Sequence, residues 1–140
     1  MIKKLLAILA MGLAAVNCCA TDVVKIPDQI ARIICSSTKG LTFPTPRQVA
    51  GIIKVESNFN VKAKNGASNG LMQVNKGSFD PTENVSAGIS MLSALRLKLG
   101  SDNASFLAYN SGLTGYKQGR YSKKYLAKVL SAQKNVDITC

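Results

Sequence analysis

Apolar residues recur along the chain at the three- and four-residue spacing of amphipathic helices, and little of the sequence alternates as a half-buried strand does. The clearest helix begins at Pro46, directly after the N-cap residue Thr45, and carries Val49, Ile52 and Ile53 on one face. The others are a helix that opens at Asp28 and ends before Gly40, one capped by Asn84 that stops at Gly100, and shorter helices over residues 106–110 and 121–132. Together these elements predict an all-α domain of five or six helices.

The N-terminus has the layout of a secretory signal peptide. Two lysines precede an apolar run over residues 5–16, and small residues stand at Cys18 and Ala20. The run is too short to cross a membrane comfortably. Cleavage after Ala20 would leave residues 21–140 as one domain, exported to the periplasm or cell envelope. A lipid anchor on Cys18 or Cys19 is the less favoured alternative, because the residue before each fits that processing poorly.

Length and composition narrow the chemistry further. A chain of 140 residues has room for one ordinary domain. It contains no His, which excludes Ser-His-Asp and Cys-His nucleophilic machinery and every His-ligated metal site. We therefore expect neither a metal nor another cofactor. Only two glutamates are present, Glu56 and Glu83, so acid–base chemistry must come from very few carboxyl groups.

Two cysteines lie beyond the predicted signal peptide, Cys35 and Cys140. Export to an oxidising compartment favours a disulfide between them. The bridge would close a long loop and stabilise the fold by roughly 3 to 5 kcal/mol in the chain-entropy model. The alternative is a buried Cys35 and a free Cys140 at a frayed end.

Glu56 is the most informative polar residue. It continues the apolar face of the helix from Pro46 and lies near the C-terminal end of that helix. An apolar face is a costly place for a carboxylate, and the helix C-terminus adds negative potential. Both effects favour the neutral acid and raise its pKa. A carboxylic acid that stays protonated near neutral pH can give its proton to a glycosidic oxygen.

Four short motifs follow one another along the chain. They are Glu56-Ser57, then Gly70-Leu71-Met72-Gln73, then Asn84-Val85 with Gly88 four residues after Asn84, and finally Ala108-Tyr109-Asn110-Ser111-Gly112. Their order and spacing resemble the catalytic domain of the family 1 lytic transglycosylases, which has a lysozyme-like fold. The resemblance covers roughly residues 28 to 132. Each motif is weak alone, and the combination behind a signal peptide carries the resemblance.

The resemblance implies a role for each matching residue. Glu56 matches the single catalytic acid and base, and Ser57 beside it would support the helix end. The stretch from Gly70 to Gln73 would line the saccharide cleft. There Met72 would offer an adaptable apolar surface to a sugar face, and the amide of Gln73 would bind hydroxyl or acetamido groups.

Two further elements extend the implied site. Tyr109 and Asn110 match the family's Ala-Tyr-Asn-x-Gly element, in which the tyrosine approaches the catalytic acid. Tyr125 falls where the family has another cleft-facing tyrosine. The loop before Gly70 carries Asn65 and Ser68 in place of a clear family serine, so the resemblance does not say which of them touches substrate.

The implied reaction is cleavage of the β-1,4 bond between N-acetylmuramic acid and N-acetylglucosamine in peptidoglycan. Glu56 would act first as acid and then as base, and the product would be a 1,6-anhydro sugar. The alternative function of a hydrolytic muramidase with the same fold stays open, because glycosidases usually use two carboxylates and Asp80 or Glu83 could supply the second. By analogy with small stand-alone members, a secretion, conjugation or pilus apparatus is the expected partner.

The excess of positive charge leaves open an alternative function that is not enzymatic. Lys and Arg number 18 against 7 Asp and Glu, for a net charge of +11, and basic residues are dense between Lys117 and Lys134. Such a run is typical of a solvated helix face, but it also suits a non-catalytic cationic protein that binds peptidoglycan or nucleic acid. Export argues against nucleic acid. Contact with a membrane is expected only through the signal peptide or a lipid anchor.

Overall fold

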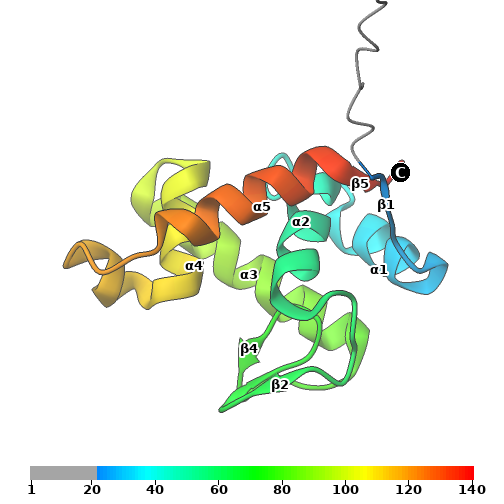
Figure 1. Ribbon diagram of the computed structural model, residues 1–140. Coiled ribbons are helices and arrows are strands. Elements are labelled where there is room, and N and C mark those ends of the chain that lie inside the picture. The colour runs from blue at the N-terminus through cyan, green and yellow to red at the C-terminus, as the bar shows by residue number, and fades with distance from the viewer. Residues whose placement is uncertain (1–21) are drawn as a thin grey trace, which may run out of the picture.

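The computed structural model describes residues 22–140, which form five helices joined by loops and short strands (Figure 1). The helices are α1 (Asp28–Thr38), α2 (Pro46–Ser57), α3 (Pro81–Leu99), α4 (Asp102–Lys117) and α5 (Lys123–Asn135). The predicted all-α class is confirmed. The signal peptide predicted over residues 1–20 lies outside the described residues.

Capping side chains set where α2 and α3 begin. The Thr45 hydroxyl accepts the Gln48 N–H at 3.2 Å, and the Gln48 side chain accepts the Thr45 N–H at 2.8 Å, which is the reciprocal pair of a capping box. In α3 the N-cap is Asp80, which accepts the Glu83 N–H at 2.9 Å. The prediction that Asn84 caps this helix is wrong, because Asn84 lies a full turn inside it.

The fourth helix is longer than the one predicted over residues 106–110. It starts at Asp102, and its N-cap is Ser101, whose hydroxyl accepts the Ala104 N–H at 3.4 Å. At Gly112 the backbone leaves the helical conformation (φ 74°, ψ 153°), which glycine adopts readily because it has no Cβ. The helix therefore breaks just after Tyr109 and Asn110 and changes direction there.

The central element of the core is α2. Its predicted apolar face of Val49, Ile52 and Ile53 is fully buried, in one cluster with Ile34 of α1 and Val129 of α5. Helix α5 lies along α2 and forms its most extensive helix contact, while α3 packs against α1 and α4 (Figure 1). The last turn of α2 leaves this core, and it carries the polar end of the helix to the surface.

Two small sheets were not predicted. Strands β2 (Lys64–Asn65), β3 (Ser68–Asn69) and β4 (Val74–Asn75) form an antiparallel sheet with Asn65 opposite Ser68 and Asn69 opposite Val74. This sheet projects from the helices between α2 and α3 (Figure 1). The other sheet pairs β1 (Val24–Lys25) in parallel with β5 (Val136–Asp137). Each strand has two residues, too few for the alternation that identifies strands in a sequence.

The two ends of the described chain are held together. A disulfide joins Cys35 of α1 to Cys140, with 5.5 Å between their Cα atoms. Arg47 at the start of α2 donates hydrogen bonds to the carbonyls of Gln133 at 3.1 Å and Val136 at 2.9 Å. These contacts fix the end of α5 and β5 onto the first two helices. Within residues 22–140, none of the helices has the length and apolar character needed to cross a membrane.

Candidate active site

Two hollows adjoin at the C-terminal end of α2. The first, here called the hairpin hollow, has a volume of about 390 Å³ and is lined by Glu56, Asn65, Ser68, Gln73, Asn75, Met91, Tyr109, Asn110 and Gly112. The second, here called the α5 hollow, has a volume of about 360 Å³ and is lined by Val55, Glu56, Asn110, Ser122, Lys124, Tyr125 and Lys128. Glu56 and Asn110 line both hollows, so the Glu56 carboxyl lies where the two meet, and we call the pair of hollows the groove.

The Glu56 carboxyl lies in the last turn of α2, where the helix emerges from the core. It is half-buried, and its Oε1 accepts a hydrogen bond from the Tyr125 hydroxyl at 2.6 Å. Burial raises the pKa of Glu56 above its usual value, and the hydrogen bond from Tyr125 offsets part of that rise. A carboxyl with a raised pKa keeps its proton to higher pH, which is the property that a general acid needs.

Two tyrosines stand near Glu56, one in each hollow. Tyr125 projects from α5 into the α5 hollow, and Tyr109 projects from α4 into the hairpin hollow, where its hydroxyl donates to the Met72 carbonyl at 2.7 Å. Burial is the main cause that raises the pKa of each phenol, and the negative charge of Glu56 adds to it. Both hydroxyls therefore stay protonated and act as hydrogen-bond donors.

The turn over residues 70–73 joins β3 to β4. Leu71 and Met72 are fully buried, so they belong to the hydrophobic core. This differs from the expectation that the Met72 side chain would face a sugar. Gln73 does line the hairpin hollow, and its amide NH₂ donates to the carbonyls of Ala63 at 3.1 Å and Gly70 at 2.9 Å. These two bonds fix the amide, and its oxygen remains as the acceptor that a ligand could use.

Asn84 of α3 anchors this turn from below. Its side chain is fully buried and makes three hydrogen bonds of 2.8 Å: Oδ1 accepts the Met72 N–H, and Nδ2 donates to the carbonyls of Asn69 and Ser78. A Cβ at Gly70 would lie 2.4 Å from the Asn84 amide nitrogen, and Gly70 has a φ of 77°. Only glycine fits there, so Gly70 is a structural residue of the turn and lies outside both hollows.

The third motif acts at the same turn through its glycine. A Cβ at Gly88 would lie 2.4 Å from the Met72 Sδ, so the absence of a side chain lets the Met72 thioether pack directly on α3. Gly88 is therefore the point of close packing between α3 and the turn. Asn84 and Gly88, one helical turn apart, together fix the position of the Met72 carbonyl, which accepts the hydrogen bond from the Tyr109 hydroxyl.

Other carboxyl groups and Ser57 lie apart from the groove. Of the described residues that line the two hollows, only Glu56 is acidic. Asp80 is occupied as the cap of α3, and Glu83 is exposed in the first turn of that helix. Ser57 follows Glu56, but its hydroxyl donates to the Ile53 carbonyl at 3.1 Å within α2. Its hydroxyl is therefore used within the helix, and Ser57 lines neither hollow.

Several lining residues were not identified from the sequence. Asn75, Met91 and Gly112 complete the hairpin hollow. Met91 lies three residues after Gly88 on α3, so helical spacing could have placed it on the same face. Asn75 comes into the hollow only through the pairing of β4 with β3, which no local pattern predicts. Val55, Ser122, Lys124 and Lys128 line the α5 hollow and were also missed as site residues.

The fold and the groove define a small helical domain of the lysozyme-like class, built around one partly buried carboxyl. The chain belongs to the transglycosylase SLT domain family, whose model matches residues 44–130 and so includes every residue named above from Thr45 to Tyr125. It is similar to a protein of Enterobacteria phage PRD1 named "Transglycosylase", at 31% identity over 103 residues. That match covers 66% of this chain but 38% of the phage protein. No solved structure matches the chain.

Proposed function

We propose that this protein is a peptidoglycan lytic transglycosylase in which Glu56 acts alone as acid and then as base. The observation that carries the proposal is that Glu56 is the single acidic side chain among the described residues that line the groove. A hydrolase of this kind generally holds a second carboxylate to position or activate water. The carboxyls next in line, Asp80 and Glu83, belong to the start of α3 and line neither hollow.

In the first step the glycan strand lies along the groove with the scissile bond at Glu56. The Tyr125 hydroxyl holds Oε1 through its hydrogen bond, which leaves Oε2 to carry the proton. Glu56 gives this proton to the oxygen between muramic acid C1 and glucosamine C4. The C1–O bond breaks, its electron pair goes to the departing oxygen, and the substrate's own acetamido oxygen stabilises the positive charge at C1.

In the second step the same carboxyl acts as a base. Ionised Glu56 accepts the proton of the muramic C6 hydroxyl, and the C6 oxygen forms a bond to C1. The product is a 1,6-anhydro sugar, the acetamido group is released unchanged, and Glu56 is protonated again for the next turnover. No water is consumed. The hairpin hollow, with the amides of Gln73 and Asn110, supports binding of the hydroxyl and acetamido groups of the strand.

The test is the mass of the products from purified sacculi. Anhydro-muropeptides are lighter by one water than hydrolytic products, and digestion in ¹⁸O-labelled water leaves them without label. Labelled, reducing-end muropeptides would identify a muramidase and overturn the proposal.

Glu56→Gln separates an enzyme from a non-catalytic binder. We expect it to abolish cleavage while circular dichroism stays that of the folded domain. Glu83→Gln is the matched control, because it removes the same group outside the groove and should retain most activity. Asp80→Asn should retain it as well, since Asn is also a good N-cap. Loss of activity in either control without loss of fold would point to a second catalytic carboxyl.

A further inference from the structure

The break in α4 involves a second residue besides Gly112. Ser111 directly precedes it, and its hydroxyl donates to the Leu107 carbonyl at 2.9 Å and also lies 3.2 Å from the Gly112 carbonyl. Leu107 lies one turn back in the first half of the helix, whereas Gly112 leaves the helical conformation. A serine hydroxyl that donates to the carbonyl four residues earlier often bends a helix. The Ser111 hydroxyl is therefore placed at the break and contacts carbonyl groups on both sides of it.

Ser111 also lies against the second half of α4. A Cβ added at Gly115 would lie 3.5 Å from the Ser111 Cβ and 3.2 Å from the Arg120 carbonyl, so the bare backbone of Gly115 is close to both groups. The Gly115 carbonyl accepts the N–H groups of Gln118 at 3.2 Å and Arg120 at 2.8 Å, and these bonds fold the connection to α5 onto this turn. Ser111 is therefore in contact with both halves of α4 and, through Gly115, with the connection to α5.

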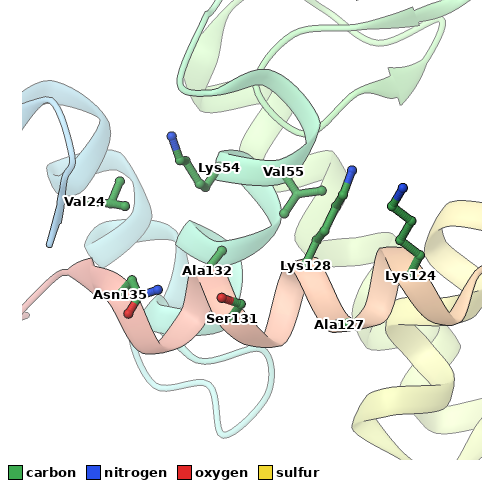
Figure 2. Close-up of a pocket in the computed structure, with 9 residues that line it drawn as sticks. All are labelled: Val24, Lys54, Val55, Lys124, Ala127, Lys128, Ser131, Ala132 and Asn135. Atoms are coloured by element: carbon green, nitrogen blue, oxygen red, sulfur yellow. The ribbon is translucent and has the colours of Figure 1, made fainter. Parts of the chain in front are cut away.

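The residues on either side of Ser111 line the groove. Asn110 lines both hollows, and Gly112 lines the hairpin hollow. In the α5 hollow Asn110 shares the lining with Lys124 and Lys128, which extend from one face of α5 and also border a neighbouring cavity between α2, α5 and β1 (Figure 2). Asn110 is exposed, so the direction of its amide depends mainly on the backbone that carries it.

We propose that Ser111 is a positioning residue, whose hydroxyl fixes the break in α4 and thereby the Asn110 amide where the two hollows meet. The inference rests on the proposed function, because the amide is positioned for the glycan strand that the groove would bind. Ser111 occupies the variable position of the Ala-Tyr-Asn-x-Gly element, so the motif itself assigns it no role. Without the hydroxyl, Gly112 samples other backbone conformations more freely, because a residue without a Cβ has wide access to them. The Asn110 amide then loses its fixed position.

The first test is the kinetics of Ser111→Ala on purified glycan strands. The substitution removes the hydroxyl and introduces a better helix former, so the domain should stay folded. We expect KM to rise about fivefold, which is the effect of losing one neutral hydrogen bond. A loss of ground-state binding leaves kcat within about twofold of wild type. The pH profile should not move, because the Tyr125 hydroxyl still donates to Glu56.

A double-mutant cycle with Asn110→Ala separates positioning from a general loss of structure. In the Asn110→Ala protein the amide is already missing, so adding Ser111→Ala should raise KM no further. Ser90→Ala is the matched control, because the exposed Ser90 hydroxyl donates to the Ser86 carbonyl at 3.0 Å in the same way, on α3 and outside both hollows. It should leave KM and kcat unchanged. An unchanged KM in Ser111→Ala, or an equal rise with and without the Asn110 side chain, would overturn the inference.

A measurement that needs no activity distinguishes failure of this inference from failure of the proposed function. Relaxation of the ¹⁵N-labelled protein reports the order of the backbone at the break. We expect the amides of residues 110–113 to be rigid in wild type and to lose order in Ser111→Ala, with no such change in Ser90→Ala. Equal order in wild type and Ser111→Ala would refute the inference. If order is lost in Ser111→Ala and yet the wild type cleaves no sacculi, the proposed function alone is contradicted.

Discussion

Asn84→Ala tests whether the turn over residues 70–73 is held from α3. The substitution removes three hydrogen bonds of 2.8 Å from a side chain with no exposed surface. At about 1 kcal/mol of net stability each, their loss costs about 3 kcal/mol. The Met72 N–H would also be left buried without a partner, which costs about 1 to 2 kcal/mol more. We therefore expect the free energy of unfolding to fall by about 4 to 5 kcal/mol, a large part of a typical domain's stability.

The functional cost of this change should exceed its effect on the folded fraction. Met72 presents its carbonyl to Tyr109, and Gln73 follows it into the hairpin hollow. When Asn84 no longer fixes the turn, both groups lose their position relative to Glu56. We expect kcat/KM to drop at temperatures where circular dichroism still reports a fully folded protein.

The assay is urea unfolding monitored by circular dichroism, together with cleavage of sacculi at low temperature. Asn103→Ala is the matched control, because it makes the same substitution at an exposed position in the first turn of α4. It should change stability by less than about 0.5 kcal/mol. A loss of under about 1 kcal/mol for Asn84→Ala, or a loss equal to that of Asn103→Ala, would show that the turn is held by something else.

Four further predictions concern the site and its frame. Tyr125→Phe removes the hydrogen bond that lowers the pKa of Glu56, so this pKa should rise further. The alkaline limb of the pH–activity profile should then move to higher pH, and a shift to lower pH would contradict the assignment of Glu56 as the acid. At pH values above the raised pKa of Glu56, the Glu56→Gln protein should be more stable than wild type, because its folded state no longer buries a carboxylate. This advantage in stability should disappear as the pH falls below the ordinary pKa of a glutamate. An advantage that grew in acid would refute the prediction. Unreduced protein should show no alkylatable thiol at Cys35 or Cys140, and replacing both with Ser should lower stability by roughly 3 to 5 kcal/mol in the chain-entropy model. Cleavage should persist in EDTA, because the chain has no His and Glu56 is the one carboxyl among the described residues that line the groove. Activity that returned only with a divalent ion would contradict this.

Local chemistry explains what could be predicted from the sequence. The start of α2 depends on Thr45 and Gln48, which are three residues apart, and the end of α3 depends on Gly100, which adopts a φ of 71°. Helical spacing also led correctly to Glu56 at the end of an apolar face. Each of these features is decided by residues within one or two turns, so the sequence alone suffices.

Long-range contacts explain what could not be predicted. Asn84 reads as a helix cap because Asn favours that position, but Asp80 competes for the same helix start and forms the cap. The Asn84 side chain instead forms hydrogen bonds with the carbonyls of Asn69 and Ser78 and with the N–H of Met72. These bonds depend on how the small sheet folds against α3. For the same reason Met72 became buried, although its motif is typical of a cleft lining.

The disulfide between Cys35 and Cys140 has a topological consequence. It closes a covalent ring across 105 residues, and that ring contains α2, the projecting sheet, α3, α4 and α5, hence every residue of the groove. A protease that cut the exposed turn at Gly66 would therefore open the ring at one point and release no fragment. Both halves would stay attached and could remain docked through the α2–α5 contact. In an environment rich in proteases, a single cleavage would nick this domain without dismantling it.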